Sequence, residues 1–316
     1  MKIVVTGALG HIGSRLLRDL PFSFPGCEIL MIDNMMTQRF CSLFNLPKKG
    51  KYTFIEKDVR NVDLAKMLQK EDVLVHLAAI TDAASSFGRE KELEDNNYKG
   101  LQHVAKAVAK KKARLIHLSS TSVYGTQKNE VDESCQENEL KPQSPYAHFK
   151  LMEEKWLKKY RKKTGLRYLT LRFGTIFGVS PGMRFHTAVN KFCWQAAMNQ
   201  PVTIWKTALH QKRAYLDLDD AVKCIIFVIQ KDFFRAKTYN VLTGNYTVAD
   251  IIRQIQKHIK NFKIVFVRHK IMNQFSYIVD NARIRKEGFA VKGDLHAGIA
   301  NTIKLILKAN QSTKEK

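Results

Sequence analysis

A tyrosine and a lysine lie four residues apart in the segment SPYAHFK, at Tyr146 and Lys150. Ser144 and Pro145 precede them and are typical of a helix N-cap and of the first turn of a helix. The spacing therefore predicts that both side chains lie on one face of a helix. A free phenol has a pKa of about 10 and is a poor base at neutral pH, but a neighbouring ammonium stabilises the phenolate. The pair thus predicts a proton acceptor at Tyr146.

Hydroxyl groups that can assist such a base occur in LSSTSVYG, at residues 118–125. This segment includes Ser119 and Ser120 at the predicted C-terminal end of a strand, the edge at which open parallel sheets bind their ligands. A hydroxyl there can donate a hydrogen bond to a reacting oxygen. Two histidines lie in the same regions, His76 at the end of a buried strand and His148 between Tyr146 and Lys150, and we interpret both as structural.

Three glycines follow the apolar run KIVV near the first residue, at Gly7, Gly10 and Gly13. Their spacing predicts a turn between a first strand and a helix over His11–Leu20, where a dinucleotide pyrophosphate rests on the N-terminus of the helix. Tight turns between a strand and a helix also use glycine for steric reasons alone, so this motif needs a second signal.

Asp33 supplies that signal, because it lies twenty residues after Gly13 at the end of a second predicted strand. A carboxylate at this point accepts hydrogen bonds from both hydroxyls of the adenosine ribose and repels a 2′-phosphate, which favours NAD over NADP. Arg39 lies close in sequence and keeps NADP open. An oxidised nicotinamide ring would add its positive charge to that of Lys150 in stabilising the phenolate.

The elements that must position these residues follow from short apolar runs that alternate with helical patterns in the first half of the chain. Helices are predicted after most of the runs, including Glu92–Lys111 and Pro145–Lys163. Strand, helix and strand in regular succession indicate parallel strands joined by right-handed crossovers, an α/β doubly wound parallel sheet of the Rossmann type. The predicted strands are Lys2–Thr6, Glu28–Asp33, Tyr52–Glu56, Val73–Leu77, Arg114–Ser119 and Arg167–Arg172.

The alternation becomes irregular after about residue 173, which predicts a smaller C-terminal substrate-binding lobe. We expect a dinucleotide-binding domain over residues 1–172, with a return segment at about 214–242. The lobe is expected over residues 173–213 and 243–316.

The composition limits the classes of function. The chain has 316 residues and a formal net charge of +24, which favours an anionic partner such as nucleic acid, an anionic membrane surface or a phosphorylated small molecule. No zinc finger, helix-turn-helix or RNA-binding signature accompanies the charge. We therefore interpret the lysine clusters at 48–51, 110–112 and 158–163 as solvated surface and expect no nucleic-acid partner. Nucleic-acid binding driven by charge alone stays an alternative.

Location and redox state also follow from the sequence. No apolar stretch approaches the roughly 18 residues that cross a bilayer, and the first residues lack the layout of a secretory signal. We therefore expect a cytoplasmic protein without a membrane span. The five cysteines are scattered singly, which predicts reduced thiols and no metal site.

Taken together, the motifs resemble those of the extended short-chain dehydrogenase/reductase family, and within it those of NAD-dependent nucleotide-sugar epimerases and dehydratases. The resemblance covers nearly the whole chain and includes IDN at 32–34, KDVRN at 57–61, HLAA at 76–79 and NYKG at 97–100. It implies NAD as the cofactor. The NAD contacts that it implies are Gly7, Gly10, His11, Ile12, Gly13, Asp33, Asn34, Asp58, Val59, Leu77, Ala78, Ala79, Asn97, Ser119, Tyr146 and Lys150.

The same resemblance implies a catalytic set of Ser120, Tyr146 and Lys150. Tyr146 would remove the proton from a sugar hydroxyl while a hydride passes from the ring carbon to the nicotinamide, and Lys150 would also hold the nicotinamide ribose. In an epimerase the keto-sugar turns over and takes the hydride back on its other face. The implied activity is that of a 4-epimerase acting on a nucleoside-diphosphate hexose.

Three alternatives stay open at this point. Dehydratases of the family carry an acidic pair before Val-Tyr-Gly, where this chain has Thr121 and Ser122, so elimination of a hydroxyl is disfavoured. Keto-sugar reductases share the fold and the catalytic set but usually prefer NADP, against which Asp33 argues. The third alternative is a non-catalytic dinucleotide-sensing protein, against which the intact catalytic set argues.

In the second lobe the resemblance assigns roles to fewer residues. QKRAYLDLDD is similar to a segment in which Arg213 clamps a diphosphate and Asp220 caps a returning helix. The family's aspartate after that arginine is Ala214 here, and its asparagine in LRFGTIFG is Thr175. The implied contacts with the nucleoside-diphosphate sugar are Thr81, Thr175, Arg184, Arg213 and Arg268, with Lys270 as an alternative to Arg268.

Two further expectations rest on the resemblance. His186 and Thr187 stand where many epimerases present another asparagine to the diphosphate. The resemblance also allows a homodimer, which would pair through the two long helices Glu92–Lys111 and Pro145–Lys163.

Overall fold

A parallel sheet of seven strands forms the centre of the computed structural model, which describes residues 1–83, 85–125, 129–267 and 276–308. The strand order is β11-β7-β5-β4-β1-β2-β3, and every neighbouring pair is parallel. The order reverses between β1 and β4, which creates the crevice where such sheets bind ligands at the carboxyl ends of their strands. The predicted α/β doubly wound sheet is therefore confirmed. The strands are β1 (Lys2–Thr6), β2 (Glu28–Asp33), β3 (Lys51–Glu56), β4 (Val73–His76), β5 (Arg114–Ser120), β7 (Arg167–Phe173) and β11 (Thr238–Val241).

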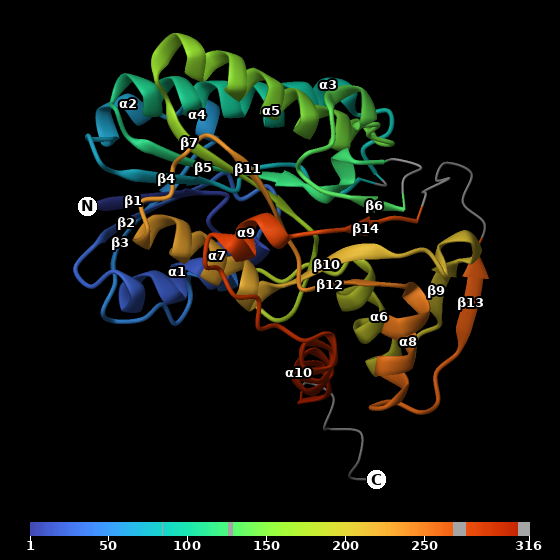
Figure 1. The fold of residues 1–316 in the computed structure, drawn as a ribbon. Coiled ribbons are helices and arrows are strands. Elements are labelled where there is room, and N and C mark those ends of the chain that lie inside the picture. Colours follow the sequence, from blue (N-terminus) through green and yellow to red (C-terminus); the bar gives the residue numbers. More distant parts are fainter. Residues whose placement is uncertain (84, 126–128, 268–275, 309–316) are drawn as a thin grey trace.

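Helices cover both faces of this sheet (Figure 1). One face carries α4 (Lys99–Lys110) and α5 (Pro145–Thr164), with the short α2 (Leu64–Met67) beside α4. The other face carries α1 (His11–Ser23) and α7 (Leu218–Gln230), which pack on each other. Burial on both faces follows from right-handed crossovers combined with the reversal of the strand order between β1 and β4.

The helices on both faces of the sheet explain why the strands are unbroken apolar runs. Successive side chains of a strand point to opposite faces, so an unbroken apolar run supplies both cores. Ile3 and Val5 of β1 belong to the cluster that includes α1 and α7, whereas Val4 belongs to the cluster that includes α4. All three side chains are completely buried.

The observed strands agree with the predicted ones to within one residue at each end. The helix predicted over Glu92–Lys111 differs, because it begins as α3 (Glu90–Leu93), passes through a π-helical turn over Glu94–Tyr98 and continues as α4. The π-helical turn carries Asn97, whose side chain accepts a hydrogen bond from the backbone N of Ile80 at 2.8 Å and donates to its carbonyl at 2.9 Å. This residue thereby fixes the segment that leaves β4 at the ligand edge.

The second lobe has its own apolar core between small sheets and helices. One sheet has the order β12-β10-β8, and β9 pairs with β13 in another. Helices α6, α8 and α10 pack against one another around the core of this lobe. Its elements are β8 (Thr175–Phe177), α6 (Ala188–Ala197), β9 (Val202–Trp205), β10 (Arg213–Asp217), β12 (Gly244–Tyr246), α8 (Val248–Gln256), β13 (Ile264–Val267) and α10 (Leu295–Lys308). A further short pair is formed by β6 (Glu130–Val131) and β14 (Ile278–Val279), which α9 (Ala282–Lys286) follows.

The return segment of about 214–242 divides between the two sheets. Its helix α7 packs on α1 and its strand β11 joins the large sheet, whereas β10 joins the small one. The domain boundaries stay a prediction. Within the ranges described above, no helix is long and apolar enough to cross a membrane.

The expectation that Asp220 caps the returning helix is wrong. The N-cap of α7 is Asp217, whose carboxylate accepts a hydrogen bond from the backbone N of Asp219 at 2.8 Å. Asp220 lies inside the helix and is buried, and it accepts from the backbone N of Lys292 and of Gly293, both at 2.9 Å. It therefore anchors the segment that leads into α10. In DLDD each aspartate is a suitable cap, and only the position of the helix start decides between them.

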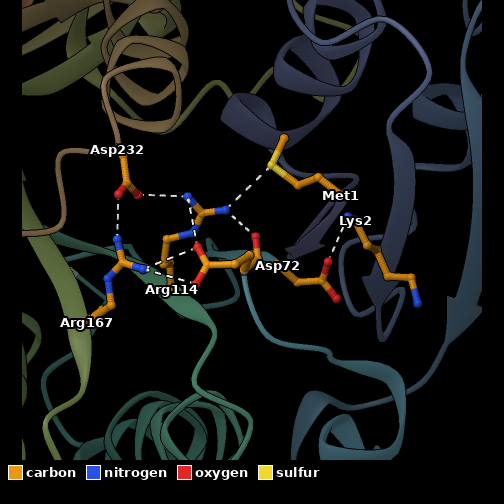
Figure 2. Close-up of polar contacts among 7 residues, drawn as sticks. Met1, Lys2, Asp72, Arg114, Arg167 and Asp232 are labelled. Atoms are coloured by element: carbon orange, nitrogen blue, oxygen red, sulfur yellow. Dashed lines mark hydrogen bonds and ion pairs between the residues drawn. The ribbon is translucent and has the colours of Figure 1, made fainter.

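Polar contacts tie together the edge of the large sheet at which the strands begin (Figure 2). Asp232, which follows α7, accepts from Arg114 at the start of β5 at 2.7 Å and from Arg167 at the start of β7 at 2.6 Å. Beside them, the backbone N of Lys2 in β1 donates to the carboxylate of Asp72 at 2.8 Å. These contacts hold the strand starts together, so the opposite edge is the one that remains for ligands.

Candidate active site

Ser120, Tyr146 and Lys150 line one cavity of about 400 Å³ at the carboxyl ends of the strands. Ser120 is the last residue of β5, and its hydroxyl oxygen accepts from the backbone N of Ser122 at 3.2 Å and from the hydroxyl of Ser122 at 2.9 Å. The other two come from the first turns of α5. The predicted cap of that helix is confirmed, because the Ser144 side chain accepts from the backbone N of Ala147 at 3.2 Å.

The Lys150 ammonium is buried and ion-paired. Its Nζ donates to Oε2 of Glu153 at 2.8 Å, one helical turn further along α5. Burial is the largest single influence on the pKa of Lys150 and lowers it, but the charges of Glu153, Tyr146 and Glu154 and the hydrogen bond to Glu153 together outweigh burial and hold the pKa above its usual value. Lys150 therefore carries its positive charge throughout the neutral pH range, as a group that stabilises a nearby phenolate must.

A second buried ion pair fixes α5 on the sheet. Arg172 of β7 makes two hydrogen bonds to the carboxylate of Glu154, at 2.9 and 2.6 Å. The hydroxyl of Ser119 donates to the same carboxylate at 2.5 Å. Ser119 was predicted as a cofactor contact, and it does line the cavity, but its hydroxyl proton is committed to Glu154. These bonds set where Tyr146 and Lys150 stand relative to the end of β5.

At two of the three glycines in the turn between β1 and α1, the surrounding backbone leaves no room for a Cβ atom. Gly7 has φ +64°, and a Cβ there would lie 2.6 Å from the backbone N of Ala78. A Cβ on Gly13 would lie 2.4 Å from the carbonyl oxygen of Ala8. A Cβ on Gly10 would lie 3.2 Å from the nearest atom, so backbone packing restricts this position less. Gly10 is the N-cap of α1 and supplies no side-chain cap, so N–H groups at the helix start are available to an anion.

His11 is the first residue of α1, and one of its ring nitrogens has no hydrogen-bond partner within the part of the chain that the structure describes. Its Nδ1 lies 2.8 Å from the hydroxyl of Ser180, whereas its buried Nε2 has no hydrogen-bond partner among the described residues. Burial, together with the charges of Arg184 and Arg39, lowers the pKa of His11 to about 3, so the ring is neutral. In the tautomer in which Nδ1 accepts from the Ser180 hydroxyl, Nε2 is a buried donor without a partner in the described part of the chain, and such a donor at a helix N-terminus fits a phosphate oxygen of a bound dinucleotide.

The adenosine side of the predicted site lies at the ends of β2 and β3. The Asp33 carboxylate accepts from the backbone N of Leu9 and of Met35, both at 3.0 Å, and stays partly exposed. Burial is the largest influence on the pKa of Arg39 and lowers it, while the charge of Asp33 acts in the opposite direction. Asp58 pairs with Arg60 at 2.6 Å.

The predicted cofactor contacts thus fall into two groups. Those that line the cavity are Ile12, Leu77, Ala79, Ser119, Tyr146 and Lys150. Those that do not are Gly7, Gly10, His11, Gly13, Asp33, Asn34, Asp58, Val59, Ala78 and Asn97. The second group lies along the ends of β1 to β4 and in the π-helical turn, as an elongated dinucleotide that runs from β3 to β5 requires.

Four of the five predicted substrate contacts line the same cavity: Thr81, Thr175, Arg184 and Arg213. Arg184 donates to the hydroxyl of Thr81 at 2.7 Å, and its buried Nε has no hydrogen-bond partner within the part of the chain that is described. The guanidinium of Arg213 lies 5.2 Å from the centre of the Tyr277 ring. Arg268 and Lys270 lie outside the described residues.

Sequence reasoning missed two groups of the site. Lys191 of α6 lines the cavity, but the segment AVNKFCWQAA gives no signal of which polar residue faces a ligand. Glu153 lies three residues after Lys150, and this spacing places the two side chains on one helix face. The sequence alone could therefore have indicated their contact. His186, noted only as a departure from the family, also lines the cavity, and burial followed by the charge of Arg184 lowers its pKa to about 4.

A Rossmann-type sheet with a serine, a tyrosine and a lysine around one cavity defines the class of the short-chain dehydrogenases and reductases. The family model described as "NAD dependent epimerase/dehydratase family" matches residues 3–241, and the chain belongs to that family. The predictions of the family, of an enzyme and of NAD as the family's cofactor are confirmed.

Three relatives show the range of activities around this chain. An uncharacterized UDP-glucose epimerase of Bacillus subtilis is 32% identical over 249 residues, 76% of this chain and 76% of that protein. A trifunctional UDP-glucose 4,6-dehydratase, 3,5-epimerase and reductase of Arabidopsis thaliana is 28% identical over 96% of this chain, but the match spans 46% of that protein. The solved UDP-glucuronic acid 4-epimerase of Bacillus cereus, in complex with UDP-glucuronic acid and NAD, has a TM-score of 0.88 at 26% identity and covers 98% of this chain and 100% of that chain.

Proposed function

We propose that this protein is an NAD-dependent 4-epimerase of a UDP-sugar. The observation that carries the proposal is the cavity in which Ser120, Tyr146 and Lys150 meet Arg184 and Arg213. A hydroxyl, a phenol and an ammonium supply proton transfer, and the two guanidinium groups supply contacts for a diphosphate. The 4-epimerase names of the solved relative and of similar proteins support this reaction over others of the family.

The residues at the end of β5 favour epimerisation over dehydration. The positions at which the resemblance places the acidic pair of dehydratases hold Thr121 and Ser122. The Ser122 hydroxyl donates to Ser120, so it orients the catalytic hydroxyl. No acid at these two positions can protonate and expel a sugar hydroxyl.

Each residue of the cavity has a role in the proposed reaction. Tyr146, as phenolate, accepts the proton of the 4-hydroxyl of the sugar and later returns it. Ser120 donates a hydrogen bond to the same oxygen, and the Lys150 ammonium stabilises the phenolate. NAD, when bound, would supply reversible hydride transfer at the sugar carbon, so that no net oxidation would result. Arg184, Arg213 and Lys191 bind the diphosphate and leave the sugar free to turn over.

The residues around the turn fit NAD. The open N–H groups at the start of α1 and the neutral ring of His11 would bind the pyrophosphate, and Asp33 would bind the adenosine ribose. Lys150 donates one hydrogen bond to Glu153 and has two further N–H groups for the nicotinamide ribose.

Asp33→Ala is expected to let NADP compete with NAD. The substitution removes the carboxylate that repels a 2′-phosphate and leaves the Arg39 guanidinium beside it. We expect the ratio of the dissociation constants for NADP and NAD to fall by about 5-fold to 30-fold, which corresponds to about 1 to 2 kcal/mol for one contact with a charged group. Titration of both cofactors into the wild type and the variant measures this ratio. A wild type that already prefers NADP would contradict the assignment and favour a keto-sugar reductase.

The proposed activity is tested with a panel of UDP-glucose, UDP-glucuronic acid and UDP-N-acetylglucosamine. Incubation with NAD is expected to convert at least one of them into its 4-epimer, without accumulation of reduced cofactor. Net consumption of reduced cofactor with a keto-sugar would instead show a reductase, and release of a deoxy keto-sugar would show a dehydratase. Cofactor binding without any sugar product would show a dinucleotide-sensing protein. A homodimer, a cytoplasmic location and the lack of a nucleic-acid partner stay predictions.

A further inference from the structure

The ammonium group of Lys150 contacts a buried carboxylate, that of Glu153. Glu153 has a side chain that is 1% exposed, and its Oε2 accepts hydrogen bonds from Nζ of Lys150 and from Nε2 of His117, both at 2.8 Å. Its Oε1 is buried without a hydrogen-bond partner in the described part of the chain. A buried carboxylate costs stability unless it is paired, so a carboxylate placed here needs an explanation.

The carboxylate is connected to the sheet as well as to the helix. His117 is a completely buried residue of β5, and its Nδ1 lies 3.2 Å from the hydroxyl of Thr170 in β7. Because Nε2 donates to Glu153, a neutral His117 accepts from Thr170 through Nδ1. One chain of hydrogen bonds thus runs from Thr170 through His117 and Glu153 to Lys150, where it ends at the cavity.

We propose that Glu153 is a positioning residue, which holds Lys150 by one N–H and weakens the positive field of Lys150 at Tyr146. Glu153 thereby sets the pH at which Tyr146 accepts the proton of the substrate. The inference rests on the proposed function of Tyr146 as the base.

Other titratable groups face Lys150 as well, but they do not balance its positive charge as Glu153 does. His76 of β4 faces Lys150, but burial and the charge of Lys150 lower its pKa to about 3, so it is neutral near pH 7. Glu154 of α5 faces Lys150 too, but its charge is balanced by Arg172.

Lys150 and Arg184 both interact electrostatically with Tyr146. Lys150 is paired with the buried carboxylate of Glu153, whereas Arg184 donates to the hydroxyl of Thr81 and is subject to the charge of Asp82. A change in the charge of Glu153 therefore changes the field of Lys150 and leaves the field of Arg184 as it is.

Glu153→Gln tests the inference, because it removes the charge and keeps an acceptor for Lys150. We expect the acid limb of kcat/KM against pH to move down by about one pH unit, because an unbalanced ammonium stabilises the phenolate more. The alkaline limb, at which Lys150 loses its proton, is expected to move down as well. Glu153→Asp keeps the charge and is the matched control, with an acid limb close to that of the wild type.

A second readout does not depend on turnover. The phenolate absorbance of the NAD-bound protein, minus that of its Tyr146→Phe variant, follows the titration of Tyr146 alone. The midpoint is expected to be about one pH unit lower in the Glu153→Gln protein than in the wild type. Thermal unfolding shows whether each variant is folded, and Glu153→Met, an uncharged residue of similar volume, replaces Glu153→Gln where the buried amide prevents folding.

The two readouts separate failure of this inference from failure of the proposed function. A folded Glu153→Gln or Glu153→Met protein with wild-type pH limbs and a wild-type phenolate midpoint would overturn the inference and leave Glu153 a structural residue. A wild type that epimerises no sugar would overturn the proposed function, and the phenolate midpoint would still decide whether Glu153 acts on Tyr146.

Discussion

Tyr146→Phe is expected to lower the rate of sugar turnover by about a thousandfold or more, with the affinity for NAD within about twofold of the wild type. The phenylalanine ring fills the same place in the first turn of α5, so the helix and its cap at Ser144 stay intact. What is lost is the group proposed to hold the proton of the sugar hydroxyl beside a buried ammonium. Turnover of the best substrate of the panel and calorimetric titration of NAD provide the two measurements.

Tyr160→Phe is the matched control for this prediction. It removes the same hydroxyl from the same helix, at a residue that stacks on Trp156 with ring centres 4.5 Å apart and does not line the cavity. Its rate is expected to stay within about twofold of the wild type. A Tyr146→Phe variant that turns over sugar as fast as Tyr160→Phe would remove Tyr146 from the mechanism, and with it the main support for the proposed function.

The part of the site that depends on local spacing was predictable from the sequence. Tyr146 and Lys150 lie on one helix and need only the cap at Ser144 and the first-turn proline to be placed. Ser120 follows from the end of a strong apolar run, since the carboxyl ends of parallel strands meet at one edge. The predicted ends of the strands lie within one residue of the observed ends, because burial on both faces makes each strand apolar along its whole length.

The parts that depend on packing were not predictable. The contact of Glu153 with His117 joins residues 36 positions apart and exists because α5 packs on β5 with a particular rotation. Lys191 faces the cavity because of how α6 docks in the second lobe, where the resemblance is thin. The π-helical turn over Glu94–Tyr98 has the same side-chain pattern as an α-helix, so the sequence indicated one regular helix.

The glycine turn shows why a correct motif did not by itself prove a cofactor. Gly7 and Gly13 are required by the contacts of the turn with Ala78 and Ala8, whatever the ligand. Of the turn's glycines, Gly10 is the one that bears on a phosphate, together with the nitrogen of His11 that has no partner within the described part of the chain. The evidence for the dinucleotide therefore comes from the open helix start and from the match to the family, and less from the glycine spacing.

Lys150→Met is expected to lower the free energy of unfolding at pH 7 by about 3 to 5 kcal/mol, because it leaves Glu153 buried without its cation. In the wild type, burial raises the pKa of Glu153 but the ammonium and His117 outweigh it and lower the pKa to about 2, below the ordinary 4.5. The pairing of Glu153 therefore contributes stability above pH 4.5, and the contribution is lost as the pH falls toward 2.

In the variant the sign of this pH dependence reverses. Burial is then opposed by His117 alone, so the pKa of Glu153 rises above its unfolded value and the protonated carboxyl is the form that the fold tolerates. Stability is fully present below about pH 4.5 and is lost as the pH rises through the raised pKa. The deficit of the variant against the wild type should therefore grow as the pH rises from about 2, first because the wild type gains the paired carboxylate up to about pH 4.5 and then because the variant loses stability above that pH, and midpoints of urea unfolding measure it. Lys158→Met, at an exposed lysine of the same helix, is expected to differ from the wild type by less than about 0.5 kcal/mol at every pH. A Lys150→Met protein with the stability and acid dependence of Lys158→Met would show that Lys150 and Glu153 do not act as a buried pair, and that Tyr146 has no fixed ammonium beside it.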